Sequence, residues 1–371
     1  ADCLYSLGLI AQSQGRYAEA ANLCQEGLAI YREIGNQSGV AECLSNMGLV
    51  AKNQGRYQEA QKLHEEALDI QRNRGNRLGI ATALNDLGVL AREQGSFQQA
   101  EKLHQEAMQI FSDIGNRHGI AASLNNLGII AFDQSRFAEA DRLYGESLQI
   151  TQELGDRHGI ASALNNLGNS AYCQWNYWDA EKFYRESLEI KIEIGDRRGV
   201  AACLGNLGFT AYCQGHYDVS ERLHKESLQI KREINSVWGI AHSLNSLGAV
   251  YVKQKKMKEA RRCLLEALKT AKEIKNHPLI TEILVVSGHM LSMTDFQGAA
   301  AIILAGAENQ VKTMNYPLDP IGHSLLEDGN SSLRKALSED ERATHKAKGL
   351  SMPLEDLIDL AMKSLGGLGK G

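Results

Sequence analysis

The chain has 371 residues, enough for two or three ordinary globular domains, with a formal net charge of −5 and seven cysteines. The mild negative charge argues against nucleic acid as the main partner. No apolar run approaches the ~20 residues of a membrane span, and no secretory signal is visible. The cysteines occupy positions that hold other small or apolar residues elsewhere in the chain, so we expect free thiols in a reducing cytoplasm.

A 40-residue repeat organises residues 1–280. Seven blocks, starting at residues 1, 41, 81, 121, 161, 201 and 241, align without a gap. Each carries Leu-x-x-Leu-Gly or a close variant, as in Leu84, Leu87 and Gly88. A glutamine stands at position 14 of every block, and position 17 is aromatic in the first six. A fixed period of this kind predicts a repeat architecture.

Each block is predicted to form two antiparallel helices. Apolar residues recur at positions 4, 7, 8 and 11, and again at 17, 20, 24, 27 and 28, which is the spacing of one helical face. Pairs such as Gly35 and Asn36 suit a helix C-cap followed at once by an N-cap. A mid-helix glycine at position 8 costs about 1 kcal/mol, so its recurrence predicts close helix packing there. We therefore expect an all-α solenoid whose stacked hairpins share a core.

These positions resemble the tetratricopeptide repeat (TPR) family. The shared features are the apolar residue at position 4, Leu-Gly at 7 and 8, alanine at 20, a bulky residue at 24 such as Tyr144, and alanine at 27. The repeat departs from the usual ~34 residues and lacks the usual proline at position 32. The longer form is similar to kinesin light chain and Leu-Gly-Asn repeat proteins, and to the TPR sensor arrays of bacterial signalling ATPases and LuxR-like regulators. The resemblance implies a right-handed superhelix that binds proteins, but it does not single out one function.

Residues 281–371 depart from the repeat. We expect a degenerate capping repeat at 281–316, in which Gly288 keeps the register, and a partly ordered tail at 317–371. Pro317 and Pro320 are predicted to interrupt helix, and a polar run follows at 327–332. Ser351 is predicted to cap a final helix near 351–365. The segment AAIILAGAE at 300–308 and the Pro-Leu-Asp-Pro element resemble the end of bacterial signalling regulators. This favours a regulator over a motor adaptor.

The start of the chain suggests further sequence upstream. Ala1 already lies inside a predicted helix and is not preceded by a methionine. We expect either more repeats or an effector domain of the same polypeptide there.

A partner-binding groove is predicted on the first helix of each block. Positions 2, 5, 6, 9 and 13 lie opposite the apolar face, and the resemblance places them on the concave side. Amides at these positions could pair with the backbone of an extended peptide, or they could brace neighbouring helices. The candidate amides are Asn85, Asn125, Asn126, Asn165, Asn166, Asn169, Asn206 and Asn245.

Aromatic residues on the same helices are candidate anchors. Interface hot spots favour exposed aromatic side chains near the centre of a patch. The alternative is packing against the next repeat or a folded-back tail. The candidates are Phe132, Tyr172, Phe209 and Tyr212.

No catalytic, metal or cofactor site is predicted. His64, His104 and His224 share position 24 and are expected to pack between helices. No set of convergent metal ligands is evident. Loop arginines recur once per block and are expected to cap helix C-termini, or else to contact an anionic partner; they are Arg77, Arg117, Arg157 and Arg197.

The favoured function is a protein-interaction scaffold that holds a peptide or partner segment in its groove, as the sensor arm of a bacterial regulator. The alternatives are a self-assembling structural solenoid and a cargo adaptor of the kinesin light chain type. Enzymatic activity is the least favoured interpretation.

Overall fold

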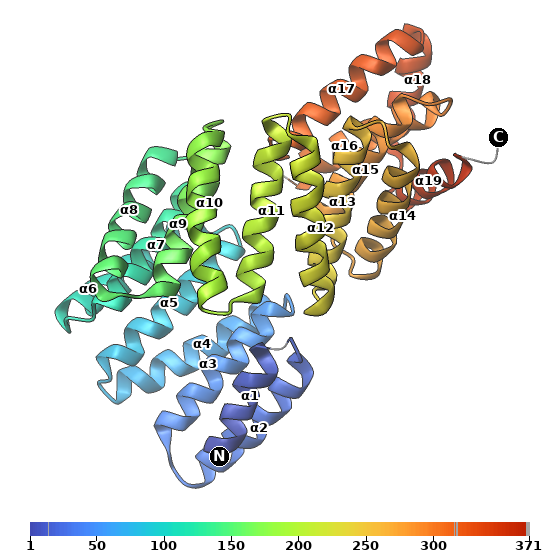
Figure 1. Ribbon diagram of the computed structural model, residues 1–371. Coiled ribbons are helices and arrows are strands. Elements are labelled where there is room, and N and C mark those ends of the chain that lie inside the picture. The colour runs from blue at the N-terminus through green and yellow to red at the C-terminus, as the bar shows by residue number, and fades with distance from the viewer. Residues whose placement is uncertain (14, 315, 317, 369–371) are drawn as a thin grey trace. The chain divides into compact units, whose positions relative to one another are not determined.

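The computed structural model describes residues 1–13, 15–314, 316 and 318–368 (Figure 1). This part of the chain contains nineteen α-helices and no strand. The chain divides into two compact units, Ala1–Ser170 and Ala171–Gly371, which are described separately below. Gln14, Pro317 and the C-terminal residues 369–371, all noted in the sequence, lie outside the described residues.

Unit 1 contains four complete helical hairpins and most of α9. The first helix of each hairpin is followed by a second one after a short turn. The helices are α1 (Asp2–Ser13), α2 (Tyr17–Glu33), α3 (Gln37–Asn53), α4 (Tyr57–Asn73), α5 (Arg77–Glu93), α6 (Phe97–Asp113), α7 (Arg117–Asp133), α8 (Phe137–Leu154) and α9 (Arg157–Cys173).

Unit 2 continues the same pattern and ends in three further helices. Its hairpins and closing helices are α10 (Tyr177–Glu193), α11 (Arg197–Cys213), α12 (Tyr217–Glu233), α13 (Val237–Lys253), α14 (Met257–Glu273), α15 (His277–Ser292), α16 (Gln297–Met314), α17 (Pro320–Ala336), α18 (Glu339–Ser351) and α19 (Leu354–Gly367).

Short polar side chains set where the first helices begin. Asn36, for example, is the N-cap of α3, and its side chain accepts a hydrogen bond from the backbone N–H of Gly39. The preceding Gly35 has φ +71°, a left-handed conformation that glycine adopts without steric cost. The same cap recurs at Asn76, Asn116, Asp156, Asp196 and Asn276. The predicted junctions between blocks are therefore confirmed.

The glycine at position 8 allows the two helices of a hairpin to touch. A Cβ placed on Gly88 would lie 2.7 Å from the ring of His104, and one on Gly128 would lie 2.6 Å from the ring of Tyr144. His64, His104 and His224 are at most 1% exposed, which confirms that position 24 packs between helices. Burial lowers the pKa of His64 and of His104 to about 4, so both rings are neutral at pH 7.

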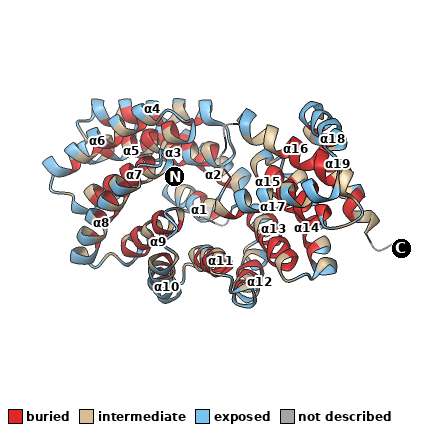
Figure 2. Ribbon diagram, turned by 90° about the horizontal axis from the view of Figure 1, so that it is seen from above, coloured by how far each residue is buried: buried red, intermediate tan, exposed pale blue. Residues whose placement is uncertain are grey.

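The first helices line the inner side of each stack. In unit 1, α1 contacts α3, α3 contacts α5, and α5 contacts α7; in unit 2, α11 contacts α13 and α13 contacts α15. Figure 2 shows buried residues concentrated where helices of a unit face one another. None of the described helices has the length and apolar character needed to cross a bilayer.

The end of unit 2 is more helical than the sequence predicts. The polar run at 327–332 lies inside α17, and Pro320 begins that helix, because the first helical position needs no N–H donor. The missed signal is the stripe Ile321, Leu325 and Leu333, whose spacing puts all three on one buried face.

The final helix also differs from its predicted start. Ser351 ends α18, and Pro353 is the N-cap of α19. Helix α17 packs on α15, α18 on α16, and α19 on α14, α15 and α16. Leu357, Ile358 and Leu365 of α19 are fully buried. The tail thus closes the apolar end of the stack, while the proposed division at residues 280 and 316 stays a prediction.

Candidate functional site

The predicted groove residues of unit 1 lie on α5, α7 and α9. Each of them is half-buried, so none is a fully solvated surface group. They are Asn85 on α5, Asn125, Asn126 and Phe132 on α7, and Asn165, Asn166 and Asn169 on α9.

Several of these amides bind their neighbours. The Nδ2 group of Asn166 donates to Oδ1 of Asn125 over 2.9 Å, which ties α9 to α7. Oδ1 of Asn85 accepts from Nδ1 of His104 at 2.7 Å and from the hydroxyl of Ser123 at 3.3 Å. These contacts favour the bracing interpretation for Asn85, Asn125 and Asn166. Peptide binding by the amide row stays a prediction.

Unit 1 also carries charged side chains on the inner helices. Lys52 lies 3.5 Å from Glu93, and Arg92 lies 3.4 Å from Asp133, so each ion pair joins consecutive first helices. Oδ2 of Asp86 on α5 lies 3.8 Å from Nδ1 of the neutral His64, and burial raises the pKa of Asp86 to about 6.

A cavity of about 180 Å³ lies on the inner side of unit 2. Its walls are α11, α13 and α15, together with His224 of α12, and the chain leading into α17 closes it. On α13 it is lined by positions 2, 5, 6 and 9 of the repeat, which are among the positions that the TPR resemblance places on the groove side. The lining residues are Phe209, Tyr212, His224, His242, Asn245, Ser246, Ala249, Glu282, Val286, Tyr316, Asp319, Ile321, Gly322 and Leu325.

Two buried oxygens of the lining have no hydrogen-bond partner among the described residues. Asn245 is 8% exposed and its Oδ1 is unpaired. Tyr212 is 7% exposed and its hydroxyl is unpaired. Buried polar atoms in native proteins are nearly always paired, so an unpaired one calls for an explanation.

The cavity also holds two carboxyl groups. The hydroxyl of Tyr316 donates to Oε1 of Glu282 over 2.7 Å. Burial is the main cause that raises the pKa of Glu282 to about 7; the Tyr316 hydrogen bond opposes it, and the charge of Asp319 adds to it. Asp319 accepts from the backbone N–H of Gly322 as the N-cap of α17, and burial raises its pKa as well.

The imidazole groups beside the carboxyls are neutral. Burial lowers the pKa of both His224 and His242 to about 3. The ring of Phe209 packs edge-on against both, with centroid distances of 4.9 and 5.5 Å. Trp238 stacks on His242 at 4.9 Å. The site therefore combines uncharged aromatic surface with two carboxyls and contains no lysine or arginine side chain in its lining.

The structure corrects the predicted exposure of the tyrosines. Tyr172 is 9% exposed and Tyr212 is 7% exposed, so neither ring lies open on the surface. Tyr212 instead borders the cavity. The reason is a pairing within blocks four, five and six, in which the aromatic at position 12 packs on the one at position 17. The ring centroids are 5.7 Å apart for Phe132 and Phe137 and for Tyr172 and Tyr177, and 5.4 Å apart for Tyr212 and Tyr217.

The remaining predicted residues of unit 2 fall in two places. Phe209 and Asn245 line the cavity, whereas Asn206 is half-buried outside its lining. The sequence reasoning missed Glu282, although it is the only charged residue in the apolar run from Leu279 to Val286. It also missed Tyr316 and Asp319, for which a pattern confined to the repeats contains no signal.

Sequence comparison identifies the repeat. Family models described as tetratricopeptide repeat match residues 1–73, 39–113, 79–153, 119–193, 159–233 and 240–274. The chain belongs to the tetratricopeptide repeat family. The predicted all-α TPR solenoid is thereby confirmed, and TPR arrays are typically non-catalytic scaffolds for protein interaction. The comparison with curated protein sequences found no match.

Solved structures with this fold include a Rap protein and a STAND protein. A Rap protein complexed with Competence and Sporulation Factor is 14% identical, with 98% of each chain covered and a TM-score of 0.65. The STAND signal-transduction ATPase PH0952 from Pyrococcus horikoshii, which has a TPR sensor, is 15% identical with a TM-score of 0.61. The match covers 95% of this TPR chain and 55% of the STAND protein. At these identities the likeness concerns the fold.

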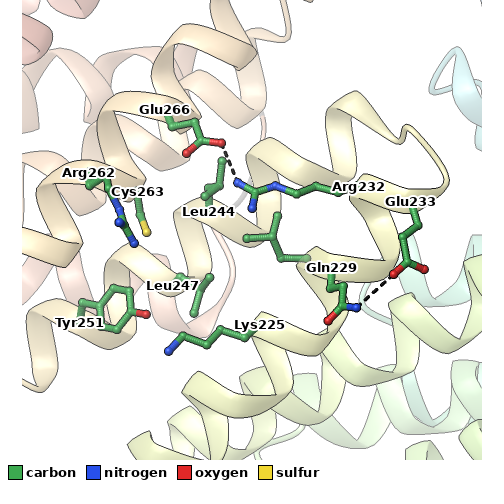
Figure 3. A pocket seen from close by; sticks show the side chains of 11 residues that line it. Lys225, Gln229, Arg232, Glu233, Leu244, Leu247, Tyr251, Arg262, Cys263 and Glu266 are labelled. Atoms are coloured by element: carbon green, nitrogen blue, oxygen red, sulfur yellow. Dashed lines mark hydrogen bonds and ion pairs between the residues drawn. The ribbon is translucent and has the colours of Figure 1, made fainter.

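A second depression of the TPR array lies between α12 and α14 (Figure 3). Its volume is about 630 Å³, and Leu244 and Leu247 of α13 lie among its lining residues. Arg232 and Glu266 face each other across it in a 2.8 Å ion pair. A similar depression of about 360 Å³ lies between α4 and α6. Because it recurs, we attribute it to the stacking of second helices.

The row of loop arginines is engaged within the scaffold. Arg77 lies 2.5 Å from Asp113, and Arg117 and Arg197 pair in the same way with Glu153 and Glu233. Each pair joins the start of the first helix to the last turn of the second helix in one TPR unit. This differs from the expected capping of helix carbonyls, because an acidic side chain is available at that turn.

Proposed function

We propose that this TPR chain binds an extended segment of a protein partner on the inner side of unit 2, and that it is the sensor arm of a larger bacterial signalling regulator. The observation that carries the proposal is the cavity, in which buried oxygens of Asn245 and Tyr212 lack partners. A cytoplasmic location suits its cysteines, all of which are free thiols.

The unpaired oxygens favour a peptide ligand. A buried polar atom without a partner costs about 1–3 kcal/mol, and a ligand that supplies the missing hydrogen bond recovers this free energy. A peptide backbone offers an N–H for Oδ1 of Asn245 and a carbonyl for the hydroxyl of Tyr212. Phe209 adds half-buried aromatic surface beside them.

The structural neighbours support the regulatory part of the proposal. The Rap structure contains a bound factor, and the STAND protein is described as having a TPR sensor. The name of the STAND protein also includes signal transduction. We extend that role to this chain as a proposal.

Peptide selection tests the proposal. A phage library of random 12-residue peptides is selected against the wild-type chain, and each enriched peptide is titrated against two variants. Ala249→Phe fills the cavity, whereas Val89→Phe puts the same ring at the equivalent repeat position of α5 in unit 1. Circular dichroism first establishes that both variants keep the helical content of the wild type.

We expect Ala249→Phe to raise the Kd of the selected peptides at least about tenfold, since a filled cavity excludes the side chain that anchors them. Val89→Phe should leave Kd within about twofold. Failure to enrich any peptide, or equal Kd values for the two variants, would contradict peptide binding at this cavity.

A further inference from the structure

We propose that the inner cavity of unit 2 is a subsite for a guanidinium or ammonium group, carried by an arginine or lysine side chain of the bound segment. This inference rests on the proposed function, and it adds which chemical group the cavity selects. Four properties of the lining support it: its charge, its unpaired acceptors, its aromatic surface and its size.

The charge of the lining is negative. Its acidic groups are Glu282 and Asp319, and it has no cationic group, since His224 and His242 are uncharged at neutral pH. Glu282, with a pKa of about 7, is partly ionised there. Two lysines of unit 2, Lys231 and Lys253, are engaged outside the lining. The Nζ group of Lys231 donates to the hydroxyl of Ser243 at 2.8 Å, and that of Lys253 pairs with Asp328 at 2.7 Å.

The hydrogen-bonding capacity of the cavity is mostly that of an acceptor. Oδ1 of Asn245 is unpaired and can only accept, and the hydroxyl of Tyr212 can accept through its lone pairs. Glu282 receives one hydrogen bond from Tyr316, which leaves its other oxygen to accept a second. A guanidinium group presents five N–H donors and no acceptor, so it matches this set.

The aromatic surface suits a cation as well. Phe209, Tyr212 and Tyr316 all line the cavity. Cations are attracted to the face of aromatic rings, and the attraction is strongest where water is excluded. Rings combined with carboxylates therefore favour a desolvated organic cation over an anion.

The size of the cavity fits one side chain. Its volume of about 180 Å³ slightly exceeds the roughly 150 Å³ of an engineered cavity that holds benzene. A planar guanidinium with its aliphatic stem can occupy such a space. Burial disfavours the ionised form of Glu282 and so raises its pKa. A bound cation beside this carboxyl would stabilise the ionised form, which favours binding of a cation in the cavity.

The closing segment of the chain completes the subsite. Tyr316 and Asp319 belong to the connection between α16 and α17, and Ile321 and Leu325 to the first turns of α17. The repeats alone supply one carboxyl, Glu282, and the return of the chain onto α15 supplies the other. We therefore expect selectivity for a cation to require the C-terminal helices.

Calorimetric titration of the full chain tests the inference with three probes. The peptides Ac-Ala-Arg-Ala-NH2 and Ac-Ala-Gln-Ala-NH2 differ in the cationic group, and agmatine carries a guanidinium without a peptide backbone. Glu282→Gln removes the buried carboxyl, and Asp319→Asn removes the second one while keeping an N-cap residue. Asp86→Asn is the matched control, because it deletes a carboxyl that burial also perturbs, but in unit 1.

We expect the wild type and Asp86→Asn to bind the arginine peptide at least about tenfold more tightly than the glutamine peptide. Both cavity variants should reduce that ratio to about threefold or less. Equal affinity for the two peptides in the wild type would overturn the inference, as would an unchanged ratio in Glu282→Gln. Binding of agmatine without binding of the arginine peptide would overturn the assignment to a peptide side chain.

The peptide selection described above separates this inference from the proposed function. Selected peptides that bind at the cavity but show no enrichment of arginine or lysine would retain peptide binding and reject the cationic subsite. A selection without any enriched peptide would reject the proposed function itself.

Discussion

Replacing Glu282 with glutamine should remove a pH-dependent loss of stability from unit 2. Glutamine has nearly the same shape and can still accept the hydrogen bond from Tyr316. It lacks the ionisation that burial opposes. The two proteins should therefore have similar stability in mild acid and differ at higher pH.

The magnitude follows from the shift in pKa. The carboxyl of Glu282 has an ordinary pKa of 4.5 and a folded-state pKa of about 7. Between these values the unfolded chain releases the proton while the folded chain keeps it. The stabilising contribution is complete below 4.5 and is lost as pH rises through 7. At about 1.4 kcal/mol per pH unit, the loss approaches ~3 kcal/mol.

Hydrogen exchange of the α15 amides is a suitable assay, because repeat arrays often unfold locally and a single global free energy is then poorly defined. Wild type and Glu282→Gln are compared at pH 5, 6, 7 and 8, so the intrinsic exchange rate cancels at each pH. The buried histidines of unit 2 also make its stability fall as pH drops below 6.5, but they are present in both proteins, so their contribution cancels in the comparison.

We expect the variant to gain protection relative to the wild type as pH rises from 5 to 8, by about 2.5 kcal/mol, because part of the total loss already occurs below pH 5. Asp86→Asn in unit 1 should leave α15 protection unchanged. A difference between wild type and Glu282→Gln that is constant across this range, or that has the opposite sign, would refute the reasoning.

Three further changes follow from the packing, each measured by thermal or denaturant unfolding. Gly128→Ala should destabilise the fold by about 1–3 kcal/mol, because the added Cβ would lie 2.6 Å from the ring of Tyr144. Gly145→Ala should stabilise it by about 0.5–1 kcal/mol, because no atom lies within 4 Å of its added Cβ. Equal effects of the two substitutions would contradict the close approach at Gly128. A double-mutant cycle on Asn125→Ala and Asn166→Ala should show a coupling of about 0.5–1.5 kcal/mol, and additive effects would show that their hydrogen bond is not a brace. Tyr212→Phe should cost little stability, since the deleted hydroxyl has no partner, but it should weaken peptide binding; a marked drop in melting temperature would disprove the unpaired state.

Much of the fold could be predicted from the sequence because of the repeat. Position 8 is glycine in all seven blocks, and the structure shows that an added Cβ there would strike the side chain at position 24, as with Gly88 and His104. Cap pairs such as Gly35 and Asn36 placed the helix boundaries. Such features are local, involving residues fewer than twenty positions apart, and they recur, so the pattern itself reveals the contact.

The exposure of individual groove residues could be predicted less well from the sequence. The TPR resemblance placed positions 5 and 9 on the inner side, and Asn245 and Phe209 do line the cavity there. It could not show that Tyr172 is buried, because the aromatic pairing of positions 12 and 17 lies across the turn between two helices. Nor could it show whether an amide such as Asn125 is free, since its partner Asn166 belongs to the next block.

By itself, then, the sequence determined the helical hairpin, its period, its caps and the apolar side of each first helix, because these depend on short-range spacing repeated along the chain. Only the tertiary structure decided the site. Glu282 lies in α15, whereas Tyr316 and Asp319 follow α16, outside any repeat. They meet because the apolar face of α17 is buried against α15, and that packing depends on the shape of the whole stack rather than on any local pattern.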